Sequence, residues 1–389
     1  MKYVFSLFGL LAQVLILSAH PMPNTLIALS VGPGRLVFDI KIPLLDVETA
    51  LSQSADSTVK GLGTLPMFAV LDKYFSKHVH LKGMDGTSWP LELASIDTLE
   101  TADPFVGNFP VLHAILHATP PDTDIRQFFL YYDAILHQII THQAILSIRQ
   151  DWDNGIHVAE GDTTARILSV IQVEHSTGEI LPVAVKLEKG SIWTGFIAML
   201  RLGMKHIAEG YDHLLFLIVL LLPAPLLADK RRWGGFGGWR YSAFRILKIV
   251  TAFTIGHSLT LIAAALGWFR LPEQPVEVVI ALSILASAIH AFRPIFAGHE
   301  AWVAGGFGLV HGLAFASILS NLNLDTSRLT LSILGFNLGI EAMQLTIVAA
   351  ILPILMLLGR TRLYPFYRVG GAIAAATLAI FWVTERIAW

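Results

Sequence analysis

The sequence contains no cysteine among its 389 residues, and this absence excludes three kinds of chemistry. No disulfide framework can hold the fold, no thiolate can bind a metal ion, and no cysteine can act as a nucleophile. A metal ion bound by this chain must therefore take nitrogen and oxygen ligands, for which the 15 histidines are candidates.

Charge is also scarce. Charged residues make up 14% of the chain and hydrophobic residues 54%, with a mean hydropathy of +0.61. Soluble domains carry about 25% charged residues, so the composition indicates a membrane protein whose first partner is the lipid bilayer. The net charge of -2 argues against a nucleic-acid partner. No G-x-x-x-x-G-K-[ST] motif is present, so any transport would be secondary or facilitated.

The first half of the chain lacks a long apolar run after its N-terminus. Residues 1–19 combine Lys2, an apolar core and Ser18-Ala19, which is typical of a secretory signal peptide. Residues 20–188 contain no stretch long enough to span a bilayer. Short apolar runs separated by turn residues predict a β-rich extracytoplasmic domain, a sandwich or related barrel, with one helix near 67–77. The strands are expected at 26–31, 36–42, 79–82, 91–96, 111–117, 127–133, 143–149, 165–173 and 181–187. We interpret His113, His117, His137 and His142 as ordinary β-surface histidines rather than a metal-capture patch.

The second half has the long apolar runs that the first lacks. Residues 189–204 predict an interfacial helix or linker with an aromatic anchor. The rest, 205–389, predicts a mainly α polytopic bundle of about six membrane-spanning helices. These spans are expected at 205–228, 245–267, 275–296, 302–320, 330–358 and 366–387.

Loop charges orient the predicted spans. Basic residues gather in the loops after the first, third and fifth spans, which the positive-inside rule makes cytoplasmic. They include Lys230, Arg231, Arg232, Arg240, Arg245, Lys248, Arg293, Arg360, Arg362 and Arg368. The N-terminal domain and the C-terminus are then both extracytoplasmic, as in a protein of a bacterial-type inner or plasma membrane.

Four ionisable residues stand at the mouth of the first span: His206, Glu209, Asp212 and His213. Such residues are costly inside a membrane, so a cluster of them is a functional-site hypothesis. On one continuous helix, positions 206, 209 and 213 share a face.

The predicted topology places polar residues of four helices at one depth. From the outer surface, His213, His257 and His311 lie at roughly 12, 15 and 14 Å, and Asn337 and Glu341 at roughly 10 and 16 Å. Imidazoles and carboxylates that converge in a dry layer suit a divalent transition metal such as nickel, cobalt or zinc. The expected ligands are His206, Asp212, His213, His257, His311 and Glu341, supported by Glu209, Asn337 and Gln344.

A short internal similarity links two of these helices. The pattern F-x-x-x-H followed by a small residue and Leu occurs at 253–259 and again at 307–313, 54 positions later. Both predicted helices run from the inside outward and carry small residues that let membrane helices approach closely. The pattern hints at a duplicated helix pair.

These motifs resemble a known family. His206-x5-Asp212-His213 is similar to the H-x5-D-H motif in the first membrane helix of the HupE/UreJ family, and 311–314 (H-G-L-A) resembles that family's H-G-x-A element. The resemblance covers about 205–389 and implies a six-helix secondary nickel or cobalt permease, with His206, Asp212, His213 and His311 as candidate metal contacts. Where that family's second motif continues with Gly and Glu, this chain has Ala316 and Ile318. The large outer domain points to a longer branch of the family.

Three functions remain open at this stage. The first is uptake or transport of a divalent transition metal. The second is an intramembrane metal-dependent hydrolase with Glu341 or Asp212 as general base. The third is a sensor or assembly protein with a structural metal. A transporter is favoured over an enzyme, although the inner half offers few polar side chains for a pore, chiefly His290, Thr251 and Thr254. The sequence does not identify a protein partner.

Overall fold

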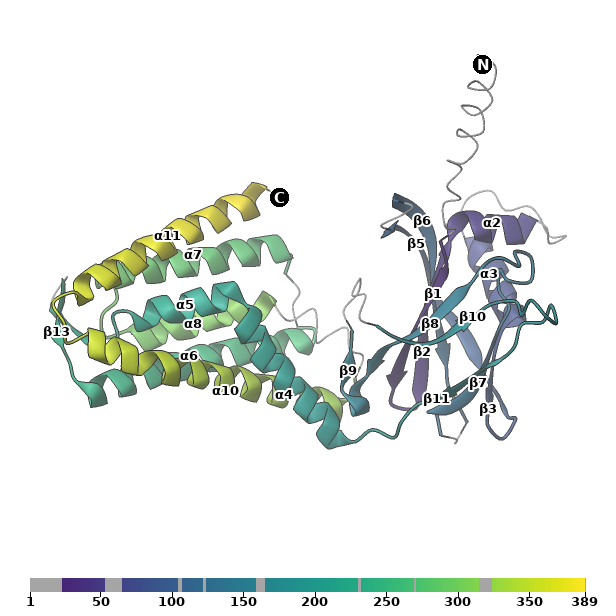
Figure 1. Ribbon diagram of the computed structural model, residues 1–389, viewed down its shortest axis with the longest axis horizontal. Coiled ribbons are helices and arrows are strands. Elements are labelled where there is room, and N and C mark those ends of the chain that lie inside the picture. Colours follow the sequence, from purple (N-terminus) through teal and green to yellow (C-terminus); the bar gives the residue numbers. More distant parts are fainter. Residues whose placement is uncertain are drawn as a thin grey trace, which may run out of the picture. The chain divides into compact units, whose positions relative to one another are not determined.

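A computed structural model describes residues 23–52, 65–103, 107–121, 124–158, 165–229, 232–268, 271–314 and 324–388. The chain divides into two compact units, Met1–Lys189 and Gly190–Trp389. Strands make up most of the first unit and helices most of the second (Figure 1). The predicted signal peptide, 1–19, lies outside the described residues.

The first unit contains two sheets. The larger has the strand order β10-β8-β1-β2-β6-β5, with β9 paired to β8, and the smaller has the order β11-β7-β3-β4. All described pairings are antiparallel except that of β1 with β8. The larger sheet comprises β1 (Thr25–Gly32), β2 (Arg35–Pro43), β5 (Leu91–Asp103), β6 (Gly107–Ala118), β8 (Ala144–Asp151), β9 (Ile156–His157) and β10 (Arg166–Ile171). The smaller comprises β3 (Val79–Gly83), β4 (Ser88–Trp89), β7 (Gln127–Tyr132) and β11 (Val183–Lys186).

Period-two burial explains why these segments form strands. In β1 and β2 buried residues alternate with more exposed ones, and the two strands pair from Leu26–Lys41 to Gly32–Arg35 across the Pro33-Gly34 turn. Gly34 supplies the positive φ of 70° that this tight turn requires. The inward faces of both sheets form one core, in which the rings of Phe38 and Phe128 meet edge to face at 6.3 Å.

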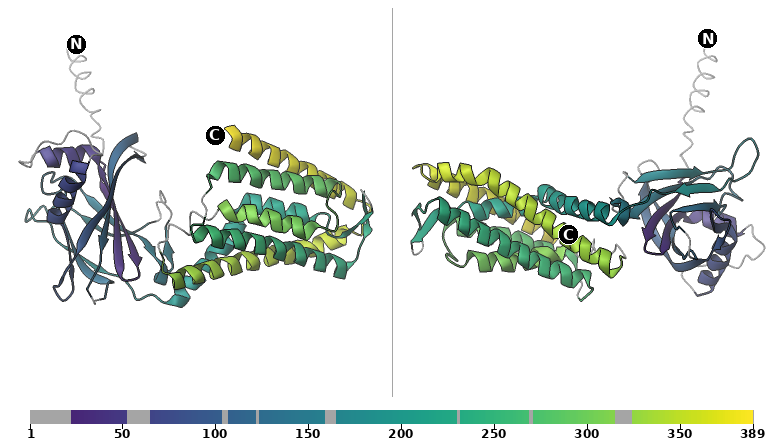
Figure 2. Two further views of the ribbon diagram at one scale, coloured as in Figure 1. Left: turned by 180° about the vertical axis from the view of Figure 1, so that it is seen from behind. Right: turned by 90° about the horizontal axis from the view of Figure 1, so that it is seen from below.

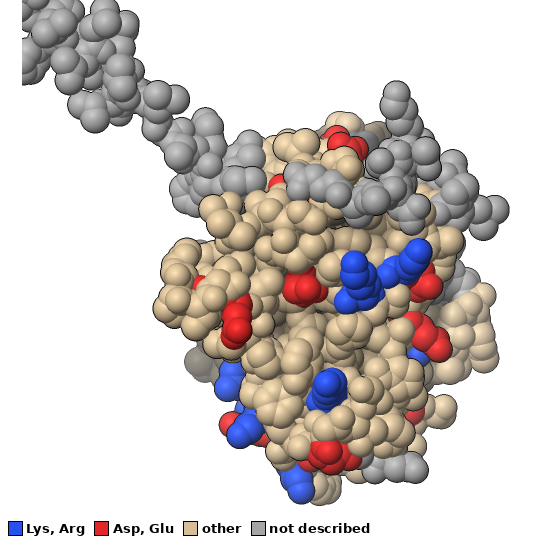
Figure 3. Space-filling view, turned by 90° about the vertical axis from the view of Figure 1, so that its right-hand side faces the viewer, with Lys and Arg blue, Asp and Glu red and all other residues tan. Residues whose placement is uncertain are grey.

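Two helices complete this core: α2 (Leu44–Ser52) and α3 (Leu65–His78). The predicted β-rich fold is therefore confirmed, including the helix near 67–77, whereas α2 was not predicted. One face of this unit shows charges of both signs interspersed over a largely uncharged surface (Figure 3). Among the described residues of that face, no large patch carries charge of one sign only.

The second unit is a helical bundle (Figure 2). Its helices are α4 (Ile192–Glu209), α5 (Tyr211–Leu221), α6 (Trp239–Ala265), α7 (Glu273–Phe292), α8 (Glu300–Ala314), α10 (Thr326–Leu358) and α11 (Tyr364–Ala388). A short hairpin of β12 (Leu226–Asp229) and β13 (Arg232–Phe236) joins α5 to α6. Side chains cap two helix starts, since Ser191 accepts the backbone N–H of Thr194 and Asp325 that of Arg328.

Four helices of the described residues are long and apolar enough to cross a membrane: α6, α7, α10 and α11. The predicted count of about six is not confirmed. The first predicted span, 205–228, is wrong as a continuous helix, because Gly210 ends α4 and begins α5, which stops at Leu221. In the predicted fourth span, α8 is described as far as Ala314, and 315–323 lie outside the described residues.

Glycines set how closely the helices pack. A Cβ on Gly308 would overlap the carbonyl oxygen of Phe253, and one on Gly256 that of Gly305, so α6 and α8 touch backbone to backbone. In the same way, α4 packs on α10, where a Cβ on Gly203 would overlap the carbonyl oxygen of Phe336. These two close pairs carry the helices that bear most of the predicted site residues.

Candidate metal centre

The helix break at Gly210 brings two histidines together. His206 lies in the last turn of α4 and His213 in the first turn of α5. Their ring centroids are 4.7 Å apart, at an interplanar angle of 65°. The sequence predicted a shared face of one continuous helix. The structure achieves the contact by a turn between two helices instead.

Asp212 fixes the orientation of its neighbour. Its Oδ1 accepts the backbone N–H of His213 at 2.8 Å and lies 2.9 Å from the ring Nδ1. A carboxylate at this distance holds the proton on Nδ1, which leaves the lone pair on Nε2. That Nε2 is buried and has no hydrogen-bond partner among the described residues. Asp212 thus orients the His213 ring so that Nε2 could accept a metal ion.

Two further histidines face this pair from α6 and α8. The ring centroid of His257 lies 6.2 Å from those of both His206 and His213, and His311 lies 5.0 Å from His213. Both His257 and His311 are fully buried. Imidazoles from three other helices therefore lie around His213, and we call His206, His213, His257 and His311 the histidine cluster.

The histidine cluster has polar atoms without partners and apolar walls. Among the described residues, both ring nitrogens of His257 and Nδ1 of His311 are buried without a hydrogen bond. Orphaned buried polar atoms are costly, so an unpaired imidazole here calls for an explanation such as an ion or water. Phe216 and Phe253 each lie 5.2 Å from the His311 ring, and Phe336 lies 5.5 Å from His206. Aromatic rings therefore border the histidine cluster on α5, α6 and α10.

The cluster is not an assembled coordination sphere. Within the part of the chain that the structure describes, no three His, Asp or Glu side chains are set to hold a metal ion. One reason is that His311 uses its Nε2 to hydrogen-bond Ser283 Oγ at 3.0 Å. Ligand nitrogens at about 2.0–2.1 Å from a tetrahedral metal lie about 3.3 Å apart, so the rings would have to turn inward to bind one.

The other predicted site residues lie in different settings. Glu209 is exposed and sits 3.7 Å from Lys205. On α10, Asn337 donates to the carbonyl oxygen of Ile333 at 2.9 Å, and Glu341 is half-buried. Gln344 is buried and accepts the hydroxyl of Thr254 at 3.0 Å, which ties α10 to α6.

The histidines of the first unit are dispersed. His113 Nε2 lies 2.9 Å from Asp39, and His142 is buried between Thr25 and Asp46, so its expected surface position is wrong. Burial opposes ionisation of Asp39, but the hydrogen bond and charge of His113, with Arg149, hold its pKa below the ordinary value. His137 stacks on His78 at 4.0 Å.

Sequence reasoning missed a second polar group in the bundle. Arg245, at the start of α6, forms an ion pair with Glu300, the first residue of α8 (2.5 Å). His290, at the end of α7, lies 3.7 Å from the same carboxylate. A signal was present, since Glu300 precedes His311 by three helical turns and therefore shares its face of α8.

Comparison with known protein families gives a match to the helical unit of the chain. No curated protein and no solved structure matches the chain significantly. The family described as HupE / UreJ protein matches residues 183–386, which include every helix from α4 to α8 and α10, and nearly all of α11. This chain therefore belongs to the HupE/UreJ family.

Proposed function

We propose that this protein moves a divalent transition-metal ion, nickel, cobalt or zinc, through a membrane by secondary transport, and that the histidine cluster binds the ion on its way. Its family suggests a membrane role related to nickel or cobalt transport. The four long apolar helices suit an integral membrane protein. In this proposal the metal ion is cargo, bound and released in each transport cycle.

The observation that carries this proposal is the set of unpartnered imidazole nitrogens at one place. His213 Nε2, His257 Nδ1 and Nε2, and His311 Nδ1 are all buried, and none has a hydrogen-bond partner in the part of the chain that the structure describes. Neutral imidazole is a good ligand for nickel, cobalt and zinc, and less suited to magnesium or calcium. A site that is not yet closed around the ion also suits a transporter, because an ion held by a complete rigid cage is released slowly.

We further propose an orientation. The β12–β13 hairpin and the starts of α6 and α8 lie at the cytoplasmic end, and the first unit lies on the outer side. Support comes from the basic residues at that end, among them Arg232, Arg240 and Lys248. The histidine cluster then belongs to the outer half of the bilayer.

The test is metal analysis of the purified full chain beside uptake of nickel, cobalt and zinc into proteoliposomes. We expect bound metal, uptake of at least one ion, and loss of both in His213→Ala and His257→Ala. His175→Ala, an exposed histidine of the first unit, is the matched control and should behave as the parent protein.

Two outcomes would contradict the proposal. Bound metal without uptake would refute transport and favour a metal-dependent hydrolase or a structural metal. Unchanged metal content in both His213→Ala and His257→Ala would refute the shared site.

A further inference from the structure

A buried polar row runs along α7. Ser283, Ser287 and His290 follow one another at i, i+4 and i+7, which places them on one helix face. Their exposed fractions are 2%, 0% and 0%, inside a helix that is otherwise strongly apolar. Ser283 Oγ lies 3.0 Å from His311 Nε2, so this row begins at the histidine cluster.

The neighbouring helix α8 completes the row. Its Glu300 and His311 are separated by three turns, about 16 Å, on one face. His311 meets Ser283 at one end, and Glu300 meets His290 at the other, where Oε1 and Nε2 are 3.7 Å apart. The α7–α8 contact therefore carries two polar pairs, joined along α7 by Ser287, which donates to the carbonyl oxygen of Ser283 at 2.8 Å.

The hydrogen bonds of His290 define its role. Its Nδ1 accepts the backbone N–H groups of Ile295 and Phe296 at 3.2 and 3.3 Å. A neutral imidazole whose Nδ1 accepts must carry its proton on Nε2, the atom that faces Glu300. The Nε2–H of His290 is thus directed toward Glu300 at 3.7 Å, beyond the length of a hydrogen bond, and His290 is not a ready metal ligand.

Arg245 closes this end of the row. Besides its ion pair with Glu300, it donates to the carbonyl oxygens of Pro223 and Leu226 at 3.3 and 2.9 Å. Its guanidinium also lies 5.2 Å from the centre of the Trp233 ring in the β12–β13 hairpin. The side chains of Arg245 and Glu300 are only 10% and 8% exposed.

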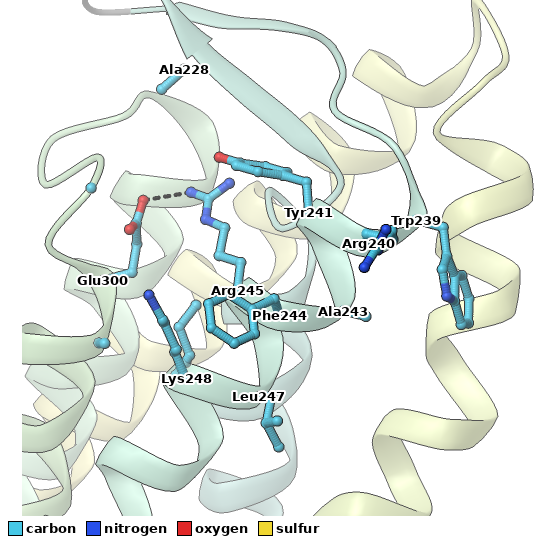
Figure 4. Close-up of a pocket in the computed structure, with 13 residues that line it drawn as sticks. Ala228, Trp239, Arg240, Tyr241, Ala243, Phe244, Arg245, Leu247, Lys248 and Glu300 are labelled. Carbon is cyan, nitrogen blue, oxygen red and sulfur yellow. Dashed lines mark hydrogen bonds and ion pairs between the residues drawn. The ribbon is translucent and has the colours of Figure 1, made fainter.

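A pocket of about 790 Å³ lies directly beyond this ion pair. Figure 4 shows Arg245 and Glu300 joined across the pocket, with Tyr241, Phe244 and Lys248 around them. The pair therefore stands between the buried row and a space at the end of the bundle. A buried ion pair contributes little net stability compared with apolar packing, so its presence here calls for another role.

We propose that the Arg245–Glu300 pair is the inner gate of a path that runs from the histidine cluster along Ser283 and Ser287. This inference rests on the proposed transport function. A cation that reaches the row is attracted by Glu300 and competes with Arg245 for its carboxylate. Because charges interact strongly in a medium of low dielectric constant, that competition loosens Arg245 and opens the row to the pocket.

The absence of cysteine makes the gate directly testable, since every single-cysteine variant is made in a natural cysteine-free background. Ser287→Cys reports on the row. Ala288→Cys is the matched control at the same depth, because Ala288 is 1% exposed but packs with Val219 and Ala372 on another face. The full chain is reconstituted without metal and treated with a membrane-impermeant, charged methanethiosulfonate reagent from the pocket side.

We expect Ser287→Cys to react slowly in the parent protein and about tenfold faster or more when combined with Arg245→Gln, because removing one buried partner strongly shifts such an equilibrium. Combined with Arg245→Lys, which keeps the charge, it should remain slow. The double replacement Arg245→Gln/Glu300→Gln leaves no unpaired charge, and Ser287→Cys in this background should also react fast. This variant tests the gate if Arg245→Gln alone fails to fold.

Three results would overturn the gate. If Ser287→Cys still reacts slowly in both Arg245→Gln and Arg245→Gln/Glu300→Gln, the ion pair does not block access to Ser287. Ala288→Cys that reacts as fast as Ser287→Cys would show a loosened bundle, and so would a Ser287→Cys that is fast with Arg245→Lys. The expected labelling beside no uptake of nickel, cobalt or zinc would refute the transport proposal while leaving the gated path in place.

Discussion

Asp212 Oδ1 lies 2.9 Å from Nδ1 of His213 and accepts the backbone N–H of the same residue at 2.8 Å. One carboxylate oxygen thus holds both the start of α5 and the orientation of an imidazole at the histidine cluster. The sequence placed Asp212 among the expected ligands. The geometry favours the supporting role, because Oδ1 is occupied by His213.

The first prediction follows from that role. Asp212→Ala removes the acceptor of the Nδ1 proton, so His213 no longer keeps its lone pair on Nε2, and nickel binding to the full chain should weaken about 10–100-fold. Asp212→Asn keeps an acceptor oxygen, so its loss of nickel affinity should be smaller. Titration calorimetry measures the change. Glu209→Gln, an exposed carboxylate beside Lys205, is the control and should bind nickel as the parent does. Equal affinities for all three variants would exclude a role for Asp212.

Gly210 is the subject of the second prediction. A Cβ there would lie 2.7 Å from the carbonyl oxygen of His206 and 2.9 Å from Nδ1 of His213, closer than such atoms pack. Gly210→Ala should therefore push the two rings apart, weaken nickel binding, and destabilise the protein by about 1–3 kcal/mol, as overpacking does. Gly370→Ala on α11 adds its methyl to open space and should change neither nickel binding nor stability. A Gly210→Ala protein that binds nickel normally would contradict the importance of this helix break.

Much of the architecture could be predicted because local sequence patterns determine its strands and helices. The alternation in β1 and β2 and the Pro33-Gly34 turn define a hairpin, and long, largely apolar segments define α6, α7, α10 and α11. The helix break was not predictable in this way. A single glycine costs only about 1 kcal/mol in a helix and is often tolerated, so Gly210 did not distinguish a helix break from a continuous span.

The roles of individual charges were harder to predict than the helices. Arg245 reads as a cytoplasmic loop charge, and Glu300 stands at a helix start where carboxylates are normally solvated. Only the packing of α6 on α8 buries the two against each other. The convergence of His213, His257 and His311 could be expected from their similar depth. Which ring nitrogens are free, however, depends on partners such as Ser283 that belong to other helices.

The third prediction compares two glycines of α8. A Cβ on Gly308 would overlap the backbone of α6 at Phe253, whereas one on Gly306 meets nothing within 4 Å. Gly308→Ala should separate α6 from α8, lower the melting temperature and weaken metal binding, since His257 and His311 sit on these helices. Gly306→Ala should be neutral or slightly stabilising, because alanine is the better helix former by about 1 kcal/mol. If both variants melt alike, the close helix contact does not limit stability.

The last prediction concerns pH and the first unit. Burial lowers the pKa of His78 below the ordinary value, although the hydrogen bond to Asp133 at 2.9 Å opposes the shift. Burial also lowers the pKa of His157. Both histidines are thus harder to protonate in the folded state than in the unfolded state, where the pKa is about 6.5. Acidification favours the unfolded chain, so stability is lost as the pH falls below about 6.5 through the folded pKa values. Asp39, whose pKa is also lowered, adds a loss only below about pH 4, where an unfolded aspartate is protonated.

Calorimetry of the full chain should therefore show the transition of the β-rich unit moving to lower temperature between pH 7 and pH 5. In His78→Asn, which has no titrating ring and can still donate to Asp133, this decrease should be smaller, because one of the two protons taken up on unfolding is removed. His80→Asn on the exposed face of β3 is the control and should keep the full decrease. A transition that rises on acidification, or a decrease that is the same in His78→Asn, would show that His78 is not harder to protonate in the folded protein.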